Sequence, residues 1–239
     1  MNAKNEKKSE KTTTGKPSKG ALRENIEALV IALVLALFIR TFIVQAFKIP
    51  SGSMLETLQI GDHILVNKFI YGIKMPFTHK TLIPVSNPKR GDIIVFIYPI
   101  DKRDFIKRVI AVEGDTLEIR DKKIFVNGTW TGHKDYERFE SEAMVPRGIP
   151  ERDFQTIWMN QIYGDHRPAD RSVKDNFGPI TIPKDKLFVM GDNRDNSHDS
   201  RFWGFVPLES VKGKAFIIYW SWDSDHFGVR WNRLGDLLK

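Results

Sequence analysis

The sequence predicts a mainly β protein: a curled, barrel-like antiparallel sheet preceded by a single N-terminal transmembrane helix. Two observations predict this fold. Between residues 62 and 220, seven short apolar segments alternate with turn residues, a pattern typical of small antiparallel domains. One longer apolar segment lies over 22–47, and little helical periodicity follows it. We therefore expect a disordered basic tail (1–21), an anchor helix (22–47) and a β-rich domain (48–239).

Composition excludes several classes of protein. Hydrophobic residues make up 41% of the 239 residues and charged residues 28%, which excludes general disorder and a bundle of many membrane spans. Cysteine is absent, so thiol nucleophiles, thiolate metal sites and disulfides are excluded together. The net charge of +7 suggests nucleic-acid binding, but residues 1–27 alone hold seven Lys or Arg against four Asp or Glu. The basic bias is thus concentrated at the N-terminus, and no nucleic-acid partner is expected.

Residues 22–47 are long enough for a membrane anchor. Twelve uninterrupted apolar residues run from Ala28 to Ile39, and a second apolar stretch continues to Phe47. A helix over the whole segment would be about 39 Å long at ~1.5 Å per residue, enough to span a bilayer with tilt. The alternatives are a signal peptide cleaved after Val44-Gln45-Ala46 and a buried soluble helix. The basic tail predicts an N-terminus in the cytoplasm and an extracytoplasmic β-rich domain.

Short strands bounded by turn residues follow the anchor. We predict strands at 62–68, 93–98, 105–112, 116–120, 124–126, 187–190 and 214–220. The segment 93–98 is a continuous apolar run typical of a fully buried strand. The dipeptide Asn127-Gly128 predicts a two-residue hairpin. The polar stretch 133–180 predicts a surface insertion or small cap rather than core.

Ser53 follows the anchor within the sequence IPSGSM (49–54). Pro and Gly favour a tight, extended turn that would present a hydroxyl close to the membrane surface. A plain linker is the alternative. No G-x-S-x-G elbow is present, and the formal S-x-x-K match at Ser86 contains Pro88, which argues against the helix that this motif needs. The six histidines show no metal-type pairing, so no metal site is expected.

Lys107 is the candidate base for such a serine. Alternation along 105–112 puts Lys107 on one face with Phe105 and Val109, while Arg108 points the other way. Apolar neighbours would desolvate the amine and lower its pKa from about 10.4, toward a value at which it can accept a proton. The alternative is a lysine on an edge strand whose ammonium group reaches solvent.

Residues 191–204, GDNRDNSHDSRFWG, form a dense polar loop between two apolar strands. Asx turns and Asp–Arg pairs would hold such a loop rigid. The loop lacks the glycine and distal glutamate of an EF-hand, and it lacks the glycines and lysine of a phosphate loop. A scaffold around a catalytic group and a plain ordered loop both remain open.

Together these motifs resemble bacterial type I signal peptidases (signal peptidase I, leader peptidase), the membrane-bound Ser/Lys-dyad serine proteases that remove signal peptides from exported preproteins. The resemblance runs through IPSGSM, RGDIIVF (90–96), KRVIAVEGD (107–115) and 191–204. It implies hydrolysis at small-x-small sites through an acyl-enzyme, with no cofactor. It also implies a single-pass protein of the bacterial cytoplasmic (inner) membrane, with preprotein signal peptides and the lipid bilayer as partners.

The resemblance implies a role for each of ten residues. Ser53 is the nucleophile and Lys107 the general base. The supporting residues are Ser51 and the Ser53 N–H for the oxyanion hole, Ser197 to orient Lys107, the Asp199–Arg201 pair to stiffen the loop, and Ile49, Met54, Leu58 and Ile106 for the substrate pockets.

Glu56 and Glu113 depart from the family pattern, because many members carry proline at these positions. Both lie on turns beside the motifs, so they bear on loop rigidity rather than on the chemistry. Two rival functions are a membrane-anchored β-domain that binds exported chains without cutting them, and a soluble self-cleaving Ser/Lys protein of the repressor type. The first rival is disfavoured by the presence of Ser51, Ser53, Lys107 and Ser197 together, and the second is disfavoured by the anchor. The Trp-rich stretch 220–231 either contacts lipid or packs on the domain.

Overall fold

The computed structural model describes residues 19–74, 81–132, 136–166, 169 and 171–238. The chain forms two compact units, Met1–Arg40 and Thr41–Lys239. Helix α1 (Lys19–Phe38) belongs to the first unit, and the π-helical turn Ile39–Ile43 that follows it crosses the boundary at Arg40. Most of the tail that we expected to be disordered, residues 1–18, lies outside the described residues, and residues 19–21 already belong to α1.

The helix predicted over 22–47 is wrong in its extent. Helix α1 ends at Phe38, and β1 (Val44–Lys48) pairs antiparallel with β2 (Asp62–Asn67). Pairing with β2 satisfies the backbone groups of this apolar stretch, and such tertiary contacts override a local preference for helix. Within the described part of the chain, no helix combines the length and the apolar character needed to cross a membrane. The predicted transmembrane helix is therefore not found.

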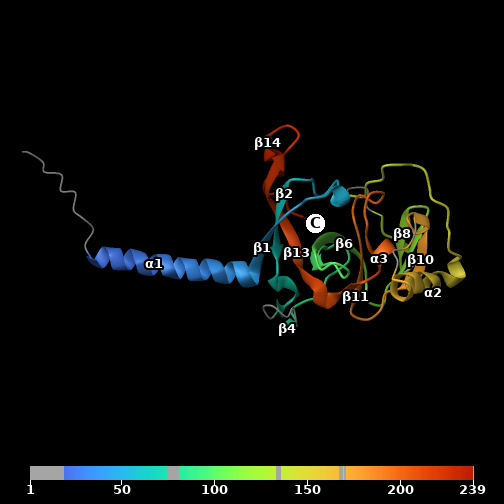
Figure 1. Ribbon diagram of the computed structural model, residues 1–239, viewed down its shortest axis with the longest axis horizontal. Helices are drawn as coiled ribbons and strands as arrows, with labels where there is room; N and C mark the ends of the chain where they lie inside the picture. Colours follow the sequence, from blue (N-terminus) through green and yellow to red (C-terminus); the bar gives the residue numbers. More distant parts are fainter. Residues whose placement is uncertain (1–18, 75–80, 133–135, 167–168, 170, 239) are drawn as a thin grey trace, which may run out of the picture. The chain divides into compact units, whose positions relative to one another are not determined.

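The main sheet of the second unit has eight strands, all antiparallel, in the order β1-β2-β13-β5-β6-β11-β12, with β14 paired to β13 (Figure 1). Its further strands are β5 (Ile93–Ile97), β6 (Asp104–Val112), β11 (Lys186–Met190), β12 (Val206–Pro207), β13 (Val211–Asp223) and β14 (Gly228–Val229). Register shifts interrupt the pairing of β13 with both β2 and β5, as bulges that bend a strand do. The sheet nevertheless stays open between its edges β1 and β12, so the barrel-like closure that we expected is absent from the described strands.

A second sheet has the order β10-β7-β8-β9, and a small hairpin pairs β3 with β4. These strands are β3 (Ile73–Lys74), β4 (Thr81–Ile83), β7 (Thr116–Arg120), β8 (Lys123–Val126), β9 (Thr129–Trp130) and β10 (Phe177–Thr181). The predicted turn at Asn127-Gly128 is confirmed: Val126 pairs with Thr129, and both turn residues have positive φ, 53° and 76°. Positive φ at both central residues is what a type I′ hairpin requires.

Short helical segments complete the second unit. The α-helices are α2 (Phe154–Met159) and α3 (Ser200–Trp203), and a π-helical turn spans Asn160–Gly164. The 3₁₀ turns are Gly52–Met54, Phe69–Tyr71, Glu151–Asp153, Arg171–Val173, Leu208–Ser210 and Trp231–Arg233.

The stretch 133–180 contributes core, contrary to the prediction that it lies only on the surface. Phe154 and Trp158 of α2 and Phe177 of β10 are almost fully buried in one hydrophobic cluster. The rings of Phe154 and Trp158 meet Phe177 edge-on, with centroids 4.9 and 5.1 Å away. The polar composition of the stretch hid this core, because only a few of its residues are large and apolar. Residues 133–135, 167, 168 and 170 lie outside the described residues.

Candidate active site

Ser53 lies in the 3₁₀ turn that follows β1. The approach to this turn is fixed by two backbone hydrogen bonds: Ile49 N–H donates to Asp62 O at 2.8 Å, and Gly61 N–H donates to Ile49 O at 3.0 Å. Pro50 fixes its own φ and restricts the preceding Ile49, and Ser51 adopts an extended conformation with φ −137° and ψ 156°. Ser51 is exposed, and its side chain makes no capping bond to the turn. The hydroxyls of Ser51 and Ser53 therefore lie on a backbone segment whose conformation is restricted.

Lys107 reaches Ser53 from the neighbouring strand β6. Its Nζ is 2.7 Å from Ser53 Oγ, although 54 residues separate the two in sequence, and it donates to Ile106 O at 3.1 Å. Lys107 is 4% exposed, and its Nζ lies 5.6 Å from the centre of the Phe105 ring. The sequence-predicted pair of a serine and a desolvated lysine is thus brought into hydrogen-bond contact.

The electrostatic setting of Lys107 suits a base. Burial lowers its pKa to about 8, while the charges of Asp199 and Asp192 act in the opposite direction and raise it. An ammonium group loses hydration when it is buried, and the protein does not fully replace that hydration here. A lysine with such a pKa is about half neutral at pH 8, whereas a free lysine is almost fully charged there.

The polar loop 191–204 holds the backbone of the Ser53 turn. Asn193 N–H donates to Ser53 O at 3.1 Å, and the Asn193 side-chain amide donates to Gly52 O at 3.3 Å. Gly191 packs so closely that a Cβ there would lie 2.3 Å from both Ser53 O and Ser197 Oγ. The loop is therefore a scaffold in contact with the candidate nucleophile Ser53, rather than a plain ordered loop.

Ser197 lies beside this turn, but its expected contact with Lys107 is missing. Within the described part of the chain, the hydrogen bonds of Lys107 Nζ go to Ser53 Oγ and Ile106 O, and none goes to Ser197. Ser197 is buried, at 8% exposure, and it is close to Ser53 through Gly191. Its role in orienting Lys107 stays a prediction.

The Asp199–Arg201 pair has the geometry that the sequence suggested. Arg201 Nε and Nη2 each donate to a different oxygen of Asp199 at 2.9 Å, and Asp199 also accepts the N–H of Gly191 at 3.2 Å. Burial alone would raise the pKa of Asp199, but the adjacent Arg201 guanidinium holds it below its usual range. A second cation–carboxylate pair was not recognised from the sequence. Arg108 donates to both oxygens of Asp192 at 2.8 and 2.7 Å, and the spacing of these two residues gave no signal of it.

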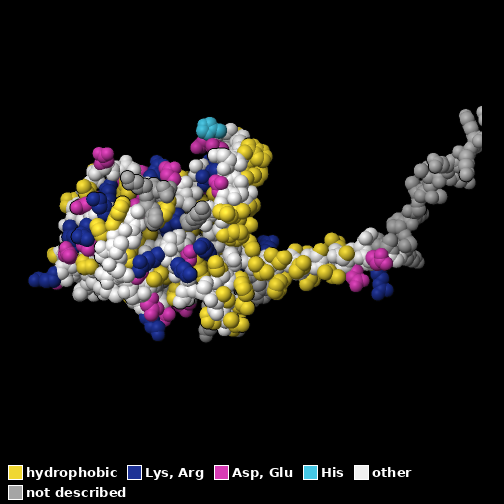
Figure 2. Space-filling model, turned by 180° about the vertical axis from the view of Figure 1, so that it is seen from behind, with side chains coloured by type: hydrophobic (Ala, Val, Ile, Leu, Met, Phe, Trp, Pro, Cys, Tyr) yellow, Lys and Arg dark blue, Asp and Glu magenta, His cyan; other side chains and the backbone are white. Residues whose placement is uncertain are grey.

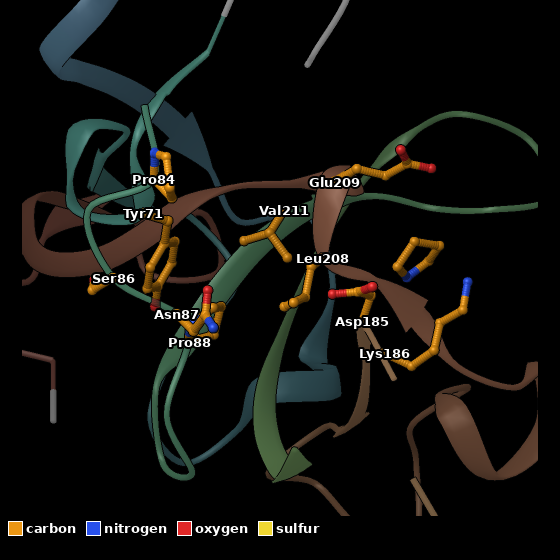
Figure 3. A pocket seen from close by; sticks show the side chains of 11 residues that line it. Tyr71, Pro84, Ser86, Asn87, Pro88, Asp185, Lys186, Leu208, Glu209 and Val211 are labelled. Atoms are coloured by element: carbon orange, nitrogen blue, oxygen red, sulfur yellow. The ribbon is translucent and has the colours of Figure 1, made fainter. Parts of the chain in front are cut away.

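The predicted substrate-pocket residues lie mostly in the core. Ile49, Met54 and Leu58 are no more than 2% exposed and belong to one hydrophobic cluster, against which the partly buried Ile106 packs. In this structure, only Ile106 of the four presents appreciable surface. A separate cavity of about 580 Å³, lined by residues that include Tyr71, Lys186 and Leu208, contains none of the predicted site residues (Figure 3).

Glu56 and Glu113, the two departures from the family pattern, are each held by a hydrogen bond. Arg138 Nη1 donates to Glu56 Oε1 at 2.5 Å. Glu113 accepts the N–H of Asp185 at 2.9 Å. Each glutamate therefore restrains its turn through a contact that a proline could not make.

The chain is similar to known proteins over most of its length. Residues 22–220 match the family described as "Signal peptidase, peptidase S26". Signal peptidase I of Aquifex aeolicus is 39% identical over 84% of this chain and 85% of its own length. The signal peptidase I of Pseudomonas aeruginosa is 37% identical over 80% of this chain and 69% of its own length. The signal peptidase I of Buchnera aphidicola subsp. Schizaphis graminum is 36% identical over 89% of this chain and 81% of its own length.

These matches define the class of the protein: it is a hydrolase, a serine endopeptidase. More particularly, the chain belongs to the signal peptidase family, peptidase S26, which confirms the resemblance seen in its motifs.

Proposed function

We propose that this protein is a membrane-associated signal peptidase that cleaves signal peptides from exported preproteins, with Ser53 as nucleophile and neutral Lys107 as general base. One observation carries the proposal: Lys107 Nζ lies 2.7 Å from Ser53 Oγ and is buried, with a pKa lowered to about 8. Relatives that align over most of the chain bear the name signal peptidase I, which supports signal peptides as the substrate class.

The mechanism follows from this pair. Neutral Lys107 accepts the Ser53 hydroxyl proton while the Oγ attacks the scissile carbonyl carbon. The Ser51 hydroxyl and the Ser53 N–H stabilise the oxyanion that forms. The lysine ammonium then protonates the leaving amine, which releases the mature chain and leaves the signal peptide as an ester on Ser53. A water molecule gives a proton to Lys107 and attacks the ester carbonyl, and the lysine ammonium returns the proton to Ser53 Oγ as the signal peptide leaves as a carboxylic acid.

The direct test is cleavage of a preprotein that bears an Ala-x-Ala site, by detergent-solubilised full-length protein. We expect Ser53→Ala and Lys107→Ala each to abolish cleavage, while both variants still bind the substrate. Lys107→Arg is the matched control for charge, and it also fails because arginine does not give up its proton. Normal cleavage by Ser53→Ala would overturn the dyad. Binding without cleavage by the unmutated protein would favour the rival function of a non-cutting binding domain.

Association with a lipid surface is the second part of the proposal. Figure 2 shows hydrophobic side chains along α1 and along the β13–β14 hairpin. Phe227 and Trp231, at this hairpin, are 84% and 73% exposed. Trp is typical of the membrane interface, where its apolar ring and its polar N–H are both accommodated, and an exposed Phe beside it adds apolar surface.

Vesicle flotation tests the lipid contact. We expect the full chain to float with phospholipid vesicles, and the double variant Phe227→Ser/Trp231→Ser to bind them more weakly. Trp130→Ser is the matched control, because Trp130 is 54% exposed on the second sheet. Equal binding by all three proteins would remove the hairpin from the lipid contact. The side of the membrane that the β-rich unit faces stays a prediction from the basic tail, which protease protection in sealed membranes can check.

A further inference from the structure

Residues 136–141, here named the strap, run beside the polar loop at the nucleophile. Arg138 N–H donates to Asp192 O at 2.9 Å, and Arg194 N–H donates to Arg138 O at 2.8 Å. These two bonds bracket Asn193 in a parallel bridge. The strap belongs to the stretch 133–180, for which the sequence gave no functional reading. It therefore contacts the catalytic scaffold from outside the recognised motifs.

Glu140 makes the most direct link to the nucleophile. Its Oε1 accepts a hydrogen bond of 2.8 Å from the side-chain amide of Asn193. The same amide nitrogen donates to Gly52 O, while Asn193 N–H donates to Ser53 O. Asn193 has no exposed surface. Because one amide nitrogen bonds both groups, the carboxylate of Glu140 sets the direction in which the amide points at the Ser53 turn.

Arg138 makes a second link, on the other side of Ser53. Its guanidinium pairs with Glu56, which stands three residues after Ser53. Both side chains are substantially exposed, at 40% and 58%, so the pair adds little to overall stability. Its effect is geometric, because Arg138 also holds the loop through its backbone. Arg138 thus ties the polar loop 191–204 to the turn that follows Ser53.

The strap is itself anchored at points that do not involve Ser53. The carboxylate of Asp195 accepts the N–H groups of Glu140 and Ser141 at 2.9 and 3.0 Å. At the other end, the Arg108 guanidinium lies 3.8 Å from the centre of the Tyr136 ring. Glu140 and Arg138 are therefore presented from a fixed backbone rather than from a free loop.

We propose that the strap is a positioning element of the active site, in which Glu140 acts through Asn193, and Arg138 acts through Glu56, to hold the Ser53 turn against Lys107. The inference rests on the proposed function, since it concerns the same serine and lysine. Small displacements of a nucleophile from its base cost large factors in rate, so side chains that never touch the substrate can still set kcat.

The first test compares Glu140→Ala with the conservative variant Glu140→Gln. Glutamine retains a carbonyl oxygen that can accept from Asn193, whereas alanine removes the acceptor. We expect Glu140→Ala to lower kcat about tenfold with little change in KM, and Glu140→Gln to keep most of the rate. A looser turn also lets water reach Lys107, and hydration of the ammonium group raises its pKa. The ascending limb of the pH–rate profile should therefore move to higher pH in Glu140→Ala but not in Glu140→Gln.

The second test reverses the Arg138–Glu56 pair. Glu56→Arg and Arg138→Glu should each lower kcat several-fold, and the double reversal Glu56→Arg/Arg138→Glu should recover part of that loss. Arg152→Gln is the matched control: it removes an exposed arginine of the same stretch 133–180, and we expect no change in kcat. A double reversal that is no better than the single variants would overturn the coupling through this pair.

Failure of the strap and failure of the dyad give different results. If Ser53→Ala and Lys107→Ala retain cleavage, the proposed function itself fails. If those variants are inactive but Glu140→Ala keeps the kcat and pH limb of the unmutated protein, the strap is not a positioning element. A loss of kcat that only follows the folded fraction, measured by thermal unfolding of each variant, would likewise overturn it.

Discussion

Arg108 and Asp192 form a two-point ion pair with almost no exposed surface, directly beside the candidate dyad. Arg108 Nε and Nη2 donate to the two carboxylate oxygens at 2.8 and 2.7 Å, and Thr57 Oγ1 donates to Asp192 at 2.5 Å. Arg108 also donates to Gly91 O at 2.8 Å. Strand β6 thus carries two adjacent basic residues with different partners. Arg108 ties the polar loop 191–204 to the sheet, and Lys107 contacts Ser53.

Removing Arg108 should destabilise the fold strongly. The variant Arg108→Met leaves the buried Asp192 carboxylate without the guanidinium that bonds both of its oxygens, which costs about 3–5 kcal/mol of the free energy of unfolding. Urea unfolding monitored by circular dichroism measures this loss. The control Arg103→Gln breaks an exposed, solvent-screened pair with Asp101 and should cost far less stability. Similar losses for both variants would contradict the structural role of the buried pair.

Gly191 should tolerate no side chain. A Cβ at this position would lie 2.3 Å from Ser53 O and Ser197 Oγ, far closer than atoms can approach, so the turn must move. We expect Gly191→Ala to lower kcat by about a hundredfold, measured on a peptide substrate. Gly164→Ala, which meets nothing within 4 Å, should keep its activity. An active Gly191→Ala enzyme would mean that the loop does not position the nucleophile.

The buried ammonium group of Lys107 should lower the free energy of unfolding. Its folded pKa of about 8 is below the ordinary 10.5, so the unfolded chain binds the proton more tightly than the folded chain. The folded state is therefore penalised at pH 7, by about 3 kcal/mol, and the penalty fades as the pH rises from 8 toward 10.5.

The isosteric variant Lys107→Met should accordingly be inactive and more stable than the unmutated protein at pH 7. The gain should shrink at pH 9 to 10, where the lysine loses its charge. Urea unfolding of both proteins at several pH values gives the comparison. A gain in stability that does not change with pH, or a loss of stability, would show that burial does not destabilise the charged form of Lys107.

Strands with their own local signal could be predicted from the sequence. The apolar run at β5 and the Asn127-Gly128 turn depend on neighbouring residues alone, and both are present. The strand β1 could not be predicted, because its apolar residues match a helix equally well and only pairing with β2 decides. The core around Trp158 was missed for a related reason, since helix α2 has only six residues and shows no periodicity.

The candidate catalytic residues could be predicted from the sequence better than the residues that hold them in place. Alternation along β6 put Lys107 and Arg108 on opposite faces, and their different partners, Ser53 and Asp192, agree with it. Asn193 gave no signal, because one Asn among many polar residues cannot be singled out by composition. The contacts of Glu140 depend on chain segments that meet only in the folded protein.

The pH dependence of kcat/KM tests the central claim most directly. In the proposed mechanism the reactive form contains neutral Lys107, whose pKa is lowered to about 8 by burial, so the rate should rise with pH as the ammonium loses its proton. Cleavage of a preprotein substrate is measured from pH 6 to 10. The account predicts an ascending limb centred near pH 8. A flat profile from pH 6 to 9, or a limb near the ordinary lysine value of 10.5, would contradict it.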